Sequence, residues 1–171
     1  MGQVCVQLAR NAGAESICAI DPIEWRRNAA LASGATDVVR PDDAPLADDP
    51  AHEGEFDVVI EAAGTQSALD LCGDLVAQHG RLNLVGYHQS DGGMRQVRVQ
   101  QWNFKAIDVV NGHVRRKGEK MDALREGIRL MEAGVLDVGA LIAEYPLPEI
   151  ETAFRDLGER KEGLFKAILI P

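Results

Sequence analysis

Short apolar runs alternate with amphipathic segments up to about residue 90 of the chain. Apolar runs of strand length lie at 16–20, 36–39, 56–61 and 81–85. Apolar residues recur every three or four positions, the period of one helix face, over 2–12, 23–33 and 66–78. Near-continuous apolar strands separated by helices are typical of a parallel sheet that is covered on both faces. The pattern therefore predicts an α/β fold.

The pattern changes beyond residue 90. An alternation at 97–100 predicts a half-exposed strand, and the run at 106–110 predicts another strand. Two amphipathic helices follow, and their apolar faces carry Met121, Leu124, Ile128, Met131 and Val135 in the first and Ile150, Ala153, Phe154 and Leu157 in the second. A final strand is predicted at 164–170. We place the domain boundary so that residues 1–111 form one domain and residues 112–171 form a separate C-terminal segment.

Composition and charge argue against several classes of function. The 171 residues carry a net charge of −9, which disfavours nucleic acid as a partner because phosphate binding needs Lys and Arg. No apolar stretch approaches the ~20 residues that span a bilayer, and the N-terminus lacks a signal-peptide pattern. Cys5, Cys18 and Cys72 are scattered and lack metal-ligand spacing. We expect a cytoplasmic protein without a membrane or nucleic-acid partner, and no metal held by this chain.

The start of the chain has part of the spacing of a dinucleotide-binding fold. In that fold a glycine-rich turn precedes a helix whose N-terminal amides bind the pyrophosphate, and an acid about 20 residues on binds the ribose. Gly2 stands at the beginning of the first predicted helix, and Asp21 follows 19 residues later at the end of a predicted strand. Two of the turn's three glycines are not in the chain, and an aspartate after a strand also serves as a turn or helix cap. Spacing alone leaves both interpretations open.

Several further motifs follow in a recognisable order. Met1 and Gly2 resemble the end of a Gly-x-Gly-x-Met-Gly turn, and further matching segments lie at 18–26, 34–37, 56–64, 80–86 and 163–166. Together they resemble the C-terminal portion of the medium-chain dehydrogenase family, the zinc-dependent alcohol, polyol and threonine dehydrogenases. The resemblance covers essentially the whole chain. It implies a Rossmann-like, doubly wound parallel sheet and NAD as the cofactor.

The resemblance implies residues that bind the adenosine half of NAD. Asp21 would accept hydrogen bonds from both ribose hydroxyls and repel a 2′-phosphate, which favours NAD over NADP. Arg26 would lie near that ribose and partly offset the preference, because a guanidinium also suits phosphate. Gly2 would belong to the pyrophosphate turn, and Lys166 would reach across to the cofactor phosphates. An ordinary surface charge is the simpler interpretation of Arg26 and Lys166.

The resemblance also implies residues along the rest of the cofactor. A turn of small residues would lie beside the adenine and ribose, and later strand ends would approach the nicotinamide and its carboxamide. In chain order these residues are Ala63 and Gly64, then Val85, Gly86 and Tyr87, then Asn111. Core packing for Val85 and turn formation for Gly64 and Gly86 are the alternatives.

The implied enzyme is an oxidoreductase that transfers hydride between an alcohol or polyol and nicotinamide. The segment at 102–113 is similar to a Trp-Asn-x-Lys-x-x-Asp-Val-x-Asn-x-His stretch of members that act on sugar alcohols and cyclitols. In the family the catalytic zinc and its ligands lie in an N-terminal domain that precedes the glycine turn. We therefore expect zinc only in a full-length enzyme and no catalytic residue in this chain. The family also pairs its nucleotide-binding domains near 95–111, which implies a homodimer or homotetramer.

Two other functions stay open. The chain could be a non-catalytic nucleotide-binding module that completes another chain's sheet. It could also belong to a zinc-independent quinone or enoyl reductase, which we favour less because those enzymes more often prefer NADPH and lack an acid at the position of Asp21.

The resemblance further implies that one strand is missing. In the strand order 3-2-1-4-5-6 the strand before the glycine turn is the central one, and it would precede Met1. The strands at 16–20 and 57–61 would then lose their shared neighbour and keep unpaired backbone groups. We expect the chain alone to be marginally stable and to bind NAD poorly, and we expect its C-terminal segment to return to the catalytic domain.

Overall fold

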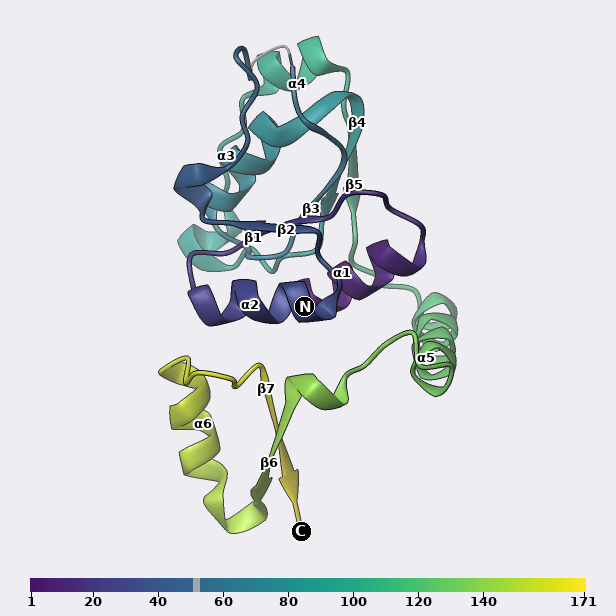
Figure 1. Ribbon diagram of the computed structural model, residues 1–171, viewed down its shortest axis with the longest axis vertical. Coiled ribbons are helices and arrows are strands. Elements are labelled where there is room, and N and C mark those ends of the chain that lie inside the picture. The colour runs from purple at the N-terminus through teal and green to yellow at the C-terminus, as the bar shows by residue number, and fades with distance from the viewer. Residues whose placement is uncertain (51–52) are drawn as a thin grey trace. The chain divides into compact units, whose positions relative to one another are not determined.

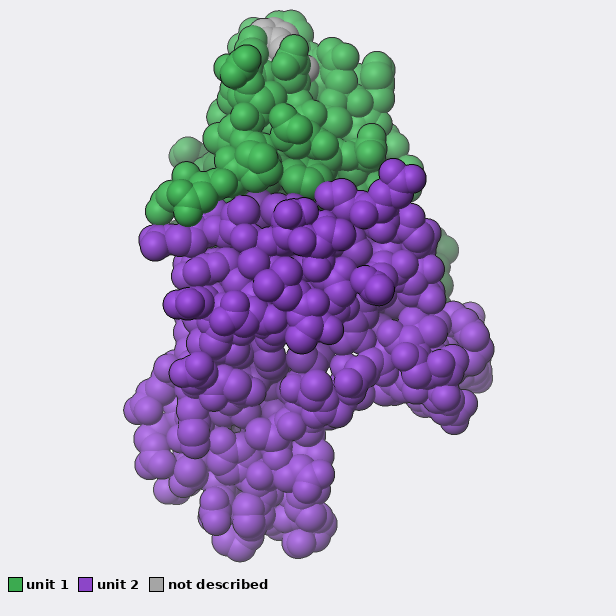
Figure 2. Space-filling model, in the orientation of Figure 1, with its two compact units in different colours: residues 1–2, 41–120 green, residues 3–40, 121–171 purple. Residues whose placement is uncertain are grey.

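All strand pairs in the described part of the chain are parallel, as the sequence pattern predicts. The computed structural model describes residues 1–50 and 53–171 and has an α/β architecture (Figure 1). Unit 1 comprises residues 1–2 and 41–120, and unit 2 comprises residues 3–40 and 121–171, coloured separately in Figure 2. None of the helices in the described residues is long and apolar enough to cross a membrane.

Unit 1 contains a three-stranded sheet in the order β3-β4-β5. The strands are β3 (Phe56–Glu61), β4 (Val76–Leu84) and β5 (Asp108–Asn111). Helix α3 (Gln66–Leu75) packs on β3 and β4, and α4 (Val99–Lys105) packs on β4. Two short 3₁₀ segments lie at Pro41–Asp43 and Ser90–Gly93. The buried apolar side chains of this unit are Val59, Leu69, Cys72, Leu75, Val76 and Leu82.

A buried lysine joins the end of α4 to the end of α3. Lys105 is 0% exposed, and its Nζ donates to the carbonyl oxygens of Gly73, Asp74 and Val76 at 2.9, 2.8 and 2.9 Å. The last carbonyls of a helix have no partner within the helix, so the ammonium satisfies acceptors that α3 leaves open. Burial lowers the pKa of Lys105, and all three of its N–H donors have partners.

Unit 2 contains two separate pairs of parallel strands, each joined by a helix. The first pair is β1 (Cys18–Ile20) and β2 (Asp37–Val39), joined by α2 (Glu24–Ser33). The second pair is β6 (Ile142–Pro146) and β7 (Lys166–Ile170), joined by α6 (Ile150–Gly158), with 3₁₀ turns at Gly139–Leu141 and Leu147–Glu149. Helix α1 (Gly2–Asn11) begins at the unit boundary, and its Val6 forms a small core with Ala30 and Ala35. Gly34 closes α2 in the left-handed conformation, φ 108°, as a helix C-cap requires.

Side chains connect the N-terminal and C-terminal parts of unit 2. The Gln7 amide bonds to the backbone of Asp137 twice, donating to its carbonyl at 3.0 Å and accepting from its N–H at 2.7 Å. The Trp25 and Phe165 rings meet edge to face with centroids 4.8 Å apart. Residues from both ends of the sequence therefore build one unit.

The sheet is divided as the missing-strand prediction requires. Strands β1 and β2 form one pair, and β3, β4 and β5 form a separate sheet. These are the two groups that remain when the central strand is removed from the order 3-2-1-4-5-6. Among the described residues, β1 pairs only with β2, and β3 only with β4. The Rossmann-like fold is thus confirmed, and within residues 1–50 and 53–171 each of these two strands keeps one edge without a sheet partner.

The predicted strand at 97–100 is wrong, because Val99 begins helix α4. The buried residues of α4 are Gln101 and Lys105, one helical turn apart and both polar. A helix held inward by polar side chains has no apolar periodicity, so the short Val-Arg-Val alternation gives a false strand signal.

Other boundaries also differ from the prediction. The helix at 66–78 ends at Leu75, because Val76 already pairs with β3. Strand β6 is missed by the sequence pattern because all of its side chains are at least partly exposed. The predicted helix over 121–135 is α5 (Lys117–Glu132), and its apolar face is present although none of its residues is buried.

Replacing the buried lysine tests how much its three hydrogen bonds contribute. Lys105→Met keeps the aliphatic stem but leaves three buried carbonyls without a donor, so the free energy of unfolding should fall by about 3 kcal/mol. Urea denaturation followed by circular dichroism measures this difference. Lys117→Met on exposed α5 is the matched control and should change stability by less than about 0.5 kcal/mol. Equal stabilities of the two variants would contradict the role of Lys105.

Candidate functional site

The carboxyl ends of β3, β4 and β5 lie at one edge of the unit 1 sheet, because the three strands are parallel and adjacent. Backbone bonds hold the loops beyond these ends together. The N–H groups of Val85 and Gly86 both donate to the Glu61 carbonyl at 2.8 Å, and the N–H of Gly112 donates to the Leu84 carbonyl at 2.8 Å. Crevices at this end of open parallel sheets are the usual ligand sites.

Two glycines in these loops leave no room for a side chain. Gly64 has φ +75°, and a Cβ there would lie 2.6 Å from the Tyr87 carbonyl oxygen. A Cβ on Gly86 would lie 2.2 Å from Glu61 Oε2 and 2.4 Å from the Gly64 nitrogen. Close backbone approach explains both residues. The turn interpretation that the sequence offered for Gly64 and Gly86 is therefore structurally sound, and it is compatible with a cofactor lying against them.

The other expected residues within 41–120 lie around this edge. Ala63 is exposed, Val85 is half-buried and Tyr87 is 68% exposed. Asn111 is exposed, and its Oδ1 accepts from the N–H of His113 at 2.9 Å. The structure thus brings six of the predicted site residues to neighbouring strand ends of one unit: Ala63, Gly64, Val85, Gly86, Tyr87 and Asn111.

His113 is an addition to this group, which the sequence offered only as the last residue of the segment at 102–113. Its ring centroid lies 6.2 Å from that of Tyr87, and its Nε2 lies 3.5 Å from the Gly86 carbonyl oxygen. The two rings therefore stand beside the Gly86 backbone. The signal that could have found His113 is its position three residues after the end of the strand predicted at 106–110.

A buried carboxylate beneath the edge is the second residue that sequence reasoning missed. Glu61 is 1% exposed, and its Oε1 accepts from the N–H groups of Ala63 and Gly64 at 2.9 and 2.7 Å. Its Oε2 lies 2.9 Å from His88 Nε2. Burial, followed by the charge of Glu61, raises the pKa of the Cys72 thiol to about 12, which keeps that cysteine protonated. The available signal is an acid at the end of the apolar run at 56–61.

Asp21 follows β1 in unit 2 and makes a turn. Its Oδ1 accepts from the Ile23 N–H at 2.8 Å, and its backbone carbonyl accepts from Arg27 Nη1 at 2.8 Å. The turn interpretation of Asp21 is therefore correct for one carboxylate oxygen. Within the described residues Oδ2 has no hydrogen-bond partner, so the carboxylate keeps an acceptor for a ligand hydroxyl.

Arg26 and the Lys166 segment come together through an aromatic contact in unit 2. The Arg26 guanidinium carbon lies 5.2 Å from the Trp25 ring centroid, and the other neighbour of that ring is Phe165. Arg26 Nε is buried without a hydrogen-bond partner in the described part of the chain, and the Arg26 carbonyl accepts from Gln3 of α1 at 3.0 Å. Lys166 is exposed directly after Phe165. Arg26 thus lies at the Trp25–Phe165 contact, and Lys166 follows that contact in sequence.

Gly2 is the first residue of α1 and is exposed. A Cβ added there would meet nothing within 4 Å. The unsatisfied N–H groups of a helix N-terminus favour anions, which agrees with the expected pyrophosphate position but does not by itself define a site.

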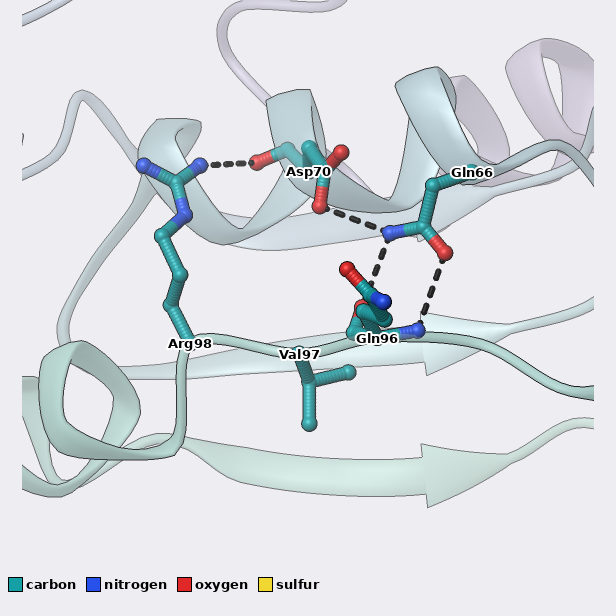
Figure 3. A pocket seen from close by; sticks show the side chains of 5 residues that line it. All are labelled: Gln66, Asp70, Gln96, Val97 and Arg98. Carbon is teal, nitrogen blue, oxygen red and sulfur yellow. Dashed lines mark hydrogen bonds between the residues drawn. The ribbon is translucent and has the colours of Figure 1, made fainter.

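A separate surface pocket of about 330 Å³ lies in unit 1 (Figure 3) and contains none of the expected site residues. Its lining residues are Gln66, Asp70, Gln96, Val97 and Arg98. Figure 3 shows that their polar groups bond to one another: Gln66 donates to Asp70 and pairs twice with the Gln96 backbone. Arg98 donates to the Asp70 carbonyl at 3.1 Å and to Asp74 at 2.7 Å. These groups have partners already, so the strand ends remain the better candidate.

The fold first defines a class, that of Rossmann-type α/β proteins with ligand sites at the carboxyl ends of parallel strands. The family model for zinc-binding dehydrogenases matches residues 1–132, and the chain therefore belongs to the zinc-binding dehydrogenase family. This finding confirms the resemblance to medium-chain dehydrogenases given by the motifs.

Individual relatives agree with this assignment. The L-threonine 3-dehydrogenase of Bacillus licheniformis is 29% identical over 178 aligned positions, which cover 100% of this chain and 49% of that protein. The L-idonate 5-dehydrogenase of Escherichia coli superposes with a TM-score of 0.84 at 22% identity, over 99% of this chain and 46% of that one. A zinc-binding dehydrogenase from Sinorhizobium meliloti, solved with NADP, gives 0.80 at 22% identity, over 99% and 49%. The chain spans about half the length of the proteins it matches.

Substituting Gly86 tests the close approach at the strand ends. Gly86→Ala forces its methyl group against Glu61 and Gly64, so the free energy of unfolding should fall by roughly 2 kcal/mol. Gly127→Ala is the matched control, because Gly127 lies within α5 and its Cβ would meet nothing within 4 Å. The control should be stabilised by roughly 0.5–1 kcal/mol. Chemical denaturation measures both values, and a neutral Gly86→Ala variant would contradict the described geometry.

Proposed function

We propose that the protein is an NAD-linked oxidoreductase and that this chain supplies most of its cofactor-binding surface. The observation that carries the proposal is the gathering of Gly64, Gly86 and Asn111 at neighbouring carboxyl ends of the parallel strands in unit 1. Membership of the zinc-binding dehydrogenase family supports the reaction class. When bound, the nicotinamide ring supplies the hydride chemistry that amino-acid side chains lack.

We propose a separate part of the cofactor for the residues of each unit. In unit 1, the backbone at Val85, Gly86 and Tyr87 and the amide of Asn111 hold the nicotinamide end, and the small residues Ala63 and Gly64 leave room for a ribose. In unit 2, Asp21 accepts from the adenosine ribose, while Arg26 and Lys166 face phosphate. Gly2, which belongs to unit 1, lies at the pyrophosphate turn. The fit is supported by the open Oδ2 of Asp21 and the unpartnered Nε of Arg26 among the described residues.

NAD is proposed as the preferred cofactor over NADP. The carboxylate of Asp21 repels a 2′-phosphate, because two anions in contact disfavour each other. Arg26 works in the opposite direction, and one structural neighbour of this chain is bound to NADP. The preference for NAD is therefore expected to depend on Asp21 itself.

Alcohol activation is proposed to lie outside this chain. No group of three or more His, Cys, Asp or Glu side chains in residues 1–50 and 53–171 has an arrangement that could hold a metal. We propose that this chain's own side chains bind and orient the cofactor. We propose an alcohol or polyol as the small-molecule substrate, on the similarity of the segment at 102–113.

We also propose a homo-oligomeric, cytoplasmic enzyme. Strand β5 supports pairing between copies, because all four of its residues are exposed and it pairs on one side only with β4 among the described strands. Val109 and Val110 add apolar surface to that edge, which favours coverage by a partner strand.

Changing the charge of Asp21 tests the cofactor assignment. Asp21→Asn keeps an oxygen for the Ile23 N–H but removes the carboxylate charge, so affinity for NADH should fall by roughly tenfold and NADPH should lose its disadvantage. NMR titration of the labelled chain measures both affinities. The method suits the weak binding that we expect because β1 and β3 have no common strand neighbour among the described residues. Asp43→Asn, in the Pro41–Asp43 turn, is the charge-matched control and should leave both affinities unchanged. Equal effects of the two variants would contradict the role of Asp21.

A further inference from the structure

Three side chains of unit 1 contact one another beside the turn at 62–64. Glu61 ends β3, and His88 and Arg95 lie in the loop that follows β4. The Glu61 and His88 side chains are 0% and 16% exposed, and Arg95 is half-buried. We propose that this triad, Glu61, His88 and Arg95, holds the turn at 62–64 and the Gly86 backbone in the conformation that binds the cofactor. The inference rests on the proposed function.

The triad holds the turn from both sides. Glu61 Oε1 accepts from the N–H groups of Ala63 and Gly64, and Arg95 Nη2 donates to the Gly64 carbonyl at 2.9 Å. Consecutive N–H groups in a tight turn form a small anion-binding concavity, and here the chain's own carboxylate occupies it. These two N–H groups are therefore taken, so a ligand would meet the turn through its small residues rather than through an open set of donors.

The contacts also determine which proton His88 carries. Arg95 Nε donates to His88 Nδ1 at 3.0 Å, so Nδ1 is the acceptor and the proton of the neutral ring lies on Nε2. That proton faces Glu61 Oε2, 2.9 Å away. The approach is electrostatic rather than a well-aligned hydrogen bond, since neither buried atom has a hydrogen-bond partner within the described residues. Arg95 thus donates to His88, and the proton of His88 points toward Glu61; we call this the donor order.

Arg95 ties this chain of contacts to the loop after β4. Its Nη1 donates to the carbonyls of Ser90 and Met94, and its Nη2 also donates to Ser90 Oγ at 2.9 Å. Glu61 in turn explains the glycine at 86, because its Oε2 occupies the space a Cβ would need. The triad therefore connects three backbone segments that face the proposed cofactor, and a preformed site lowers the ordering cost of binding. These are positioning residues, since they act through the backbone.

The test uses a pair of variants that break and then restore the donor order. Glu61→Gln replaces one carboxylate oxygen by an NH2 donor. In either orientation of the amide, this NH2 group faces another donor, which is either the turn N–H groups or His88 Nε2–H. His88 cannot relieve this by moving its proton, because its Nδ1 would then face the Arg95 donor. His88→Glu in the same chain supplies an acceptor of similar reach for both the amide and Arg95, so E61Q/H88E should restore the order.

Hydrogen exchange of the Ala63 and Gly64 amides reports the turn directly. Exchange is expressed relative to the amide of Leu82, which is fully buried in β4, so that a global loss of stability cancels. E61Q and H88E should each speed this ratio by roughly tenfold, and the double variant should return to within about threefold of the parent chain. Glu162→Gln, an exposed glutamate, is the matched control and should change nothing.

NADH affinity, measured by NMR titration of the same variants, separates positioning from mere stability. E61Q should weaken binding by roughly tenfold, and E61Q/H88E should recover it. An unchanged exchange ratio in E61Q overturns the proposal. Faster exchange with unchanged NADH affinity also overturns it, since the triad would then be structural only. If the parent chain binds no NADH at any concentration, the proposed function fails and the cofactor half of the inference fails with it, while the exchange ratio still decides whether the triad sets the turn.

Discussion

Parallel strand pairing is the constraint on which this structure depends. A parallel strand inside a sheet needs a hydrogen-bonding neighbour on each side, and β1 and β3 each have one such neighbour among the described residues. The same pairing brings the ends of β3, β4 and β5 to one edge, where short loops carry the expected cofactor residues. The site and the incompleteness of the sheet are therefore two consequences of one topology.

Two buried charged side chains stabilise the ends of secondary-structure elements in unit 1. Lys105 supplies donors to the carbonyls where α3 ends, and Glu61 supplies an acceptor to the N–H groups of the turn after β3. Each charge satisfies several backbone groups at once, which is the condition under which a buried charge is tolerated. Unit 1 thus uses one lysine and one glutamate to hold the ends of elements in place beside its small apolar core.

Much of the fold follows from the sequence, and the exceptions have a common cause. Apolar runs identify β1 to β5, because strand-length apolar runs are a clear local signal. Helix α4 is missed because its inward residues, Gln101 and Lys105, are polar. Glu61 and His88 are missed as a pair for a similar reason: their contact joins positions that are distant in sequence, and no local period announces it. Asp21 and Gly86 were singled out from the sequence, whereas no local pattern predicts the turn-forming bond of Asp21 or the carboxylate beside Gly86.

The carboxyl ends of these strands are proposed to bind a nicotinamide dinucleotide. Mapping the backbone NMR shifts of the labelled chain during NADH addition tests it most directly. We expect the largest chemical-shift changes at Asp21, Gly64, Gly86 and Asn111. Shift changes confined to the pocket around Gln66 and Arg98 would contradict this proposal. The absence of shift changes at every NADH concentration would contradict it as well.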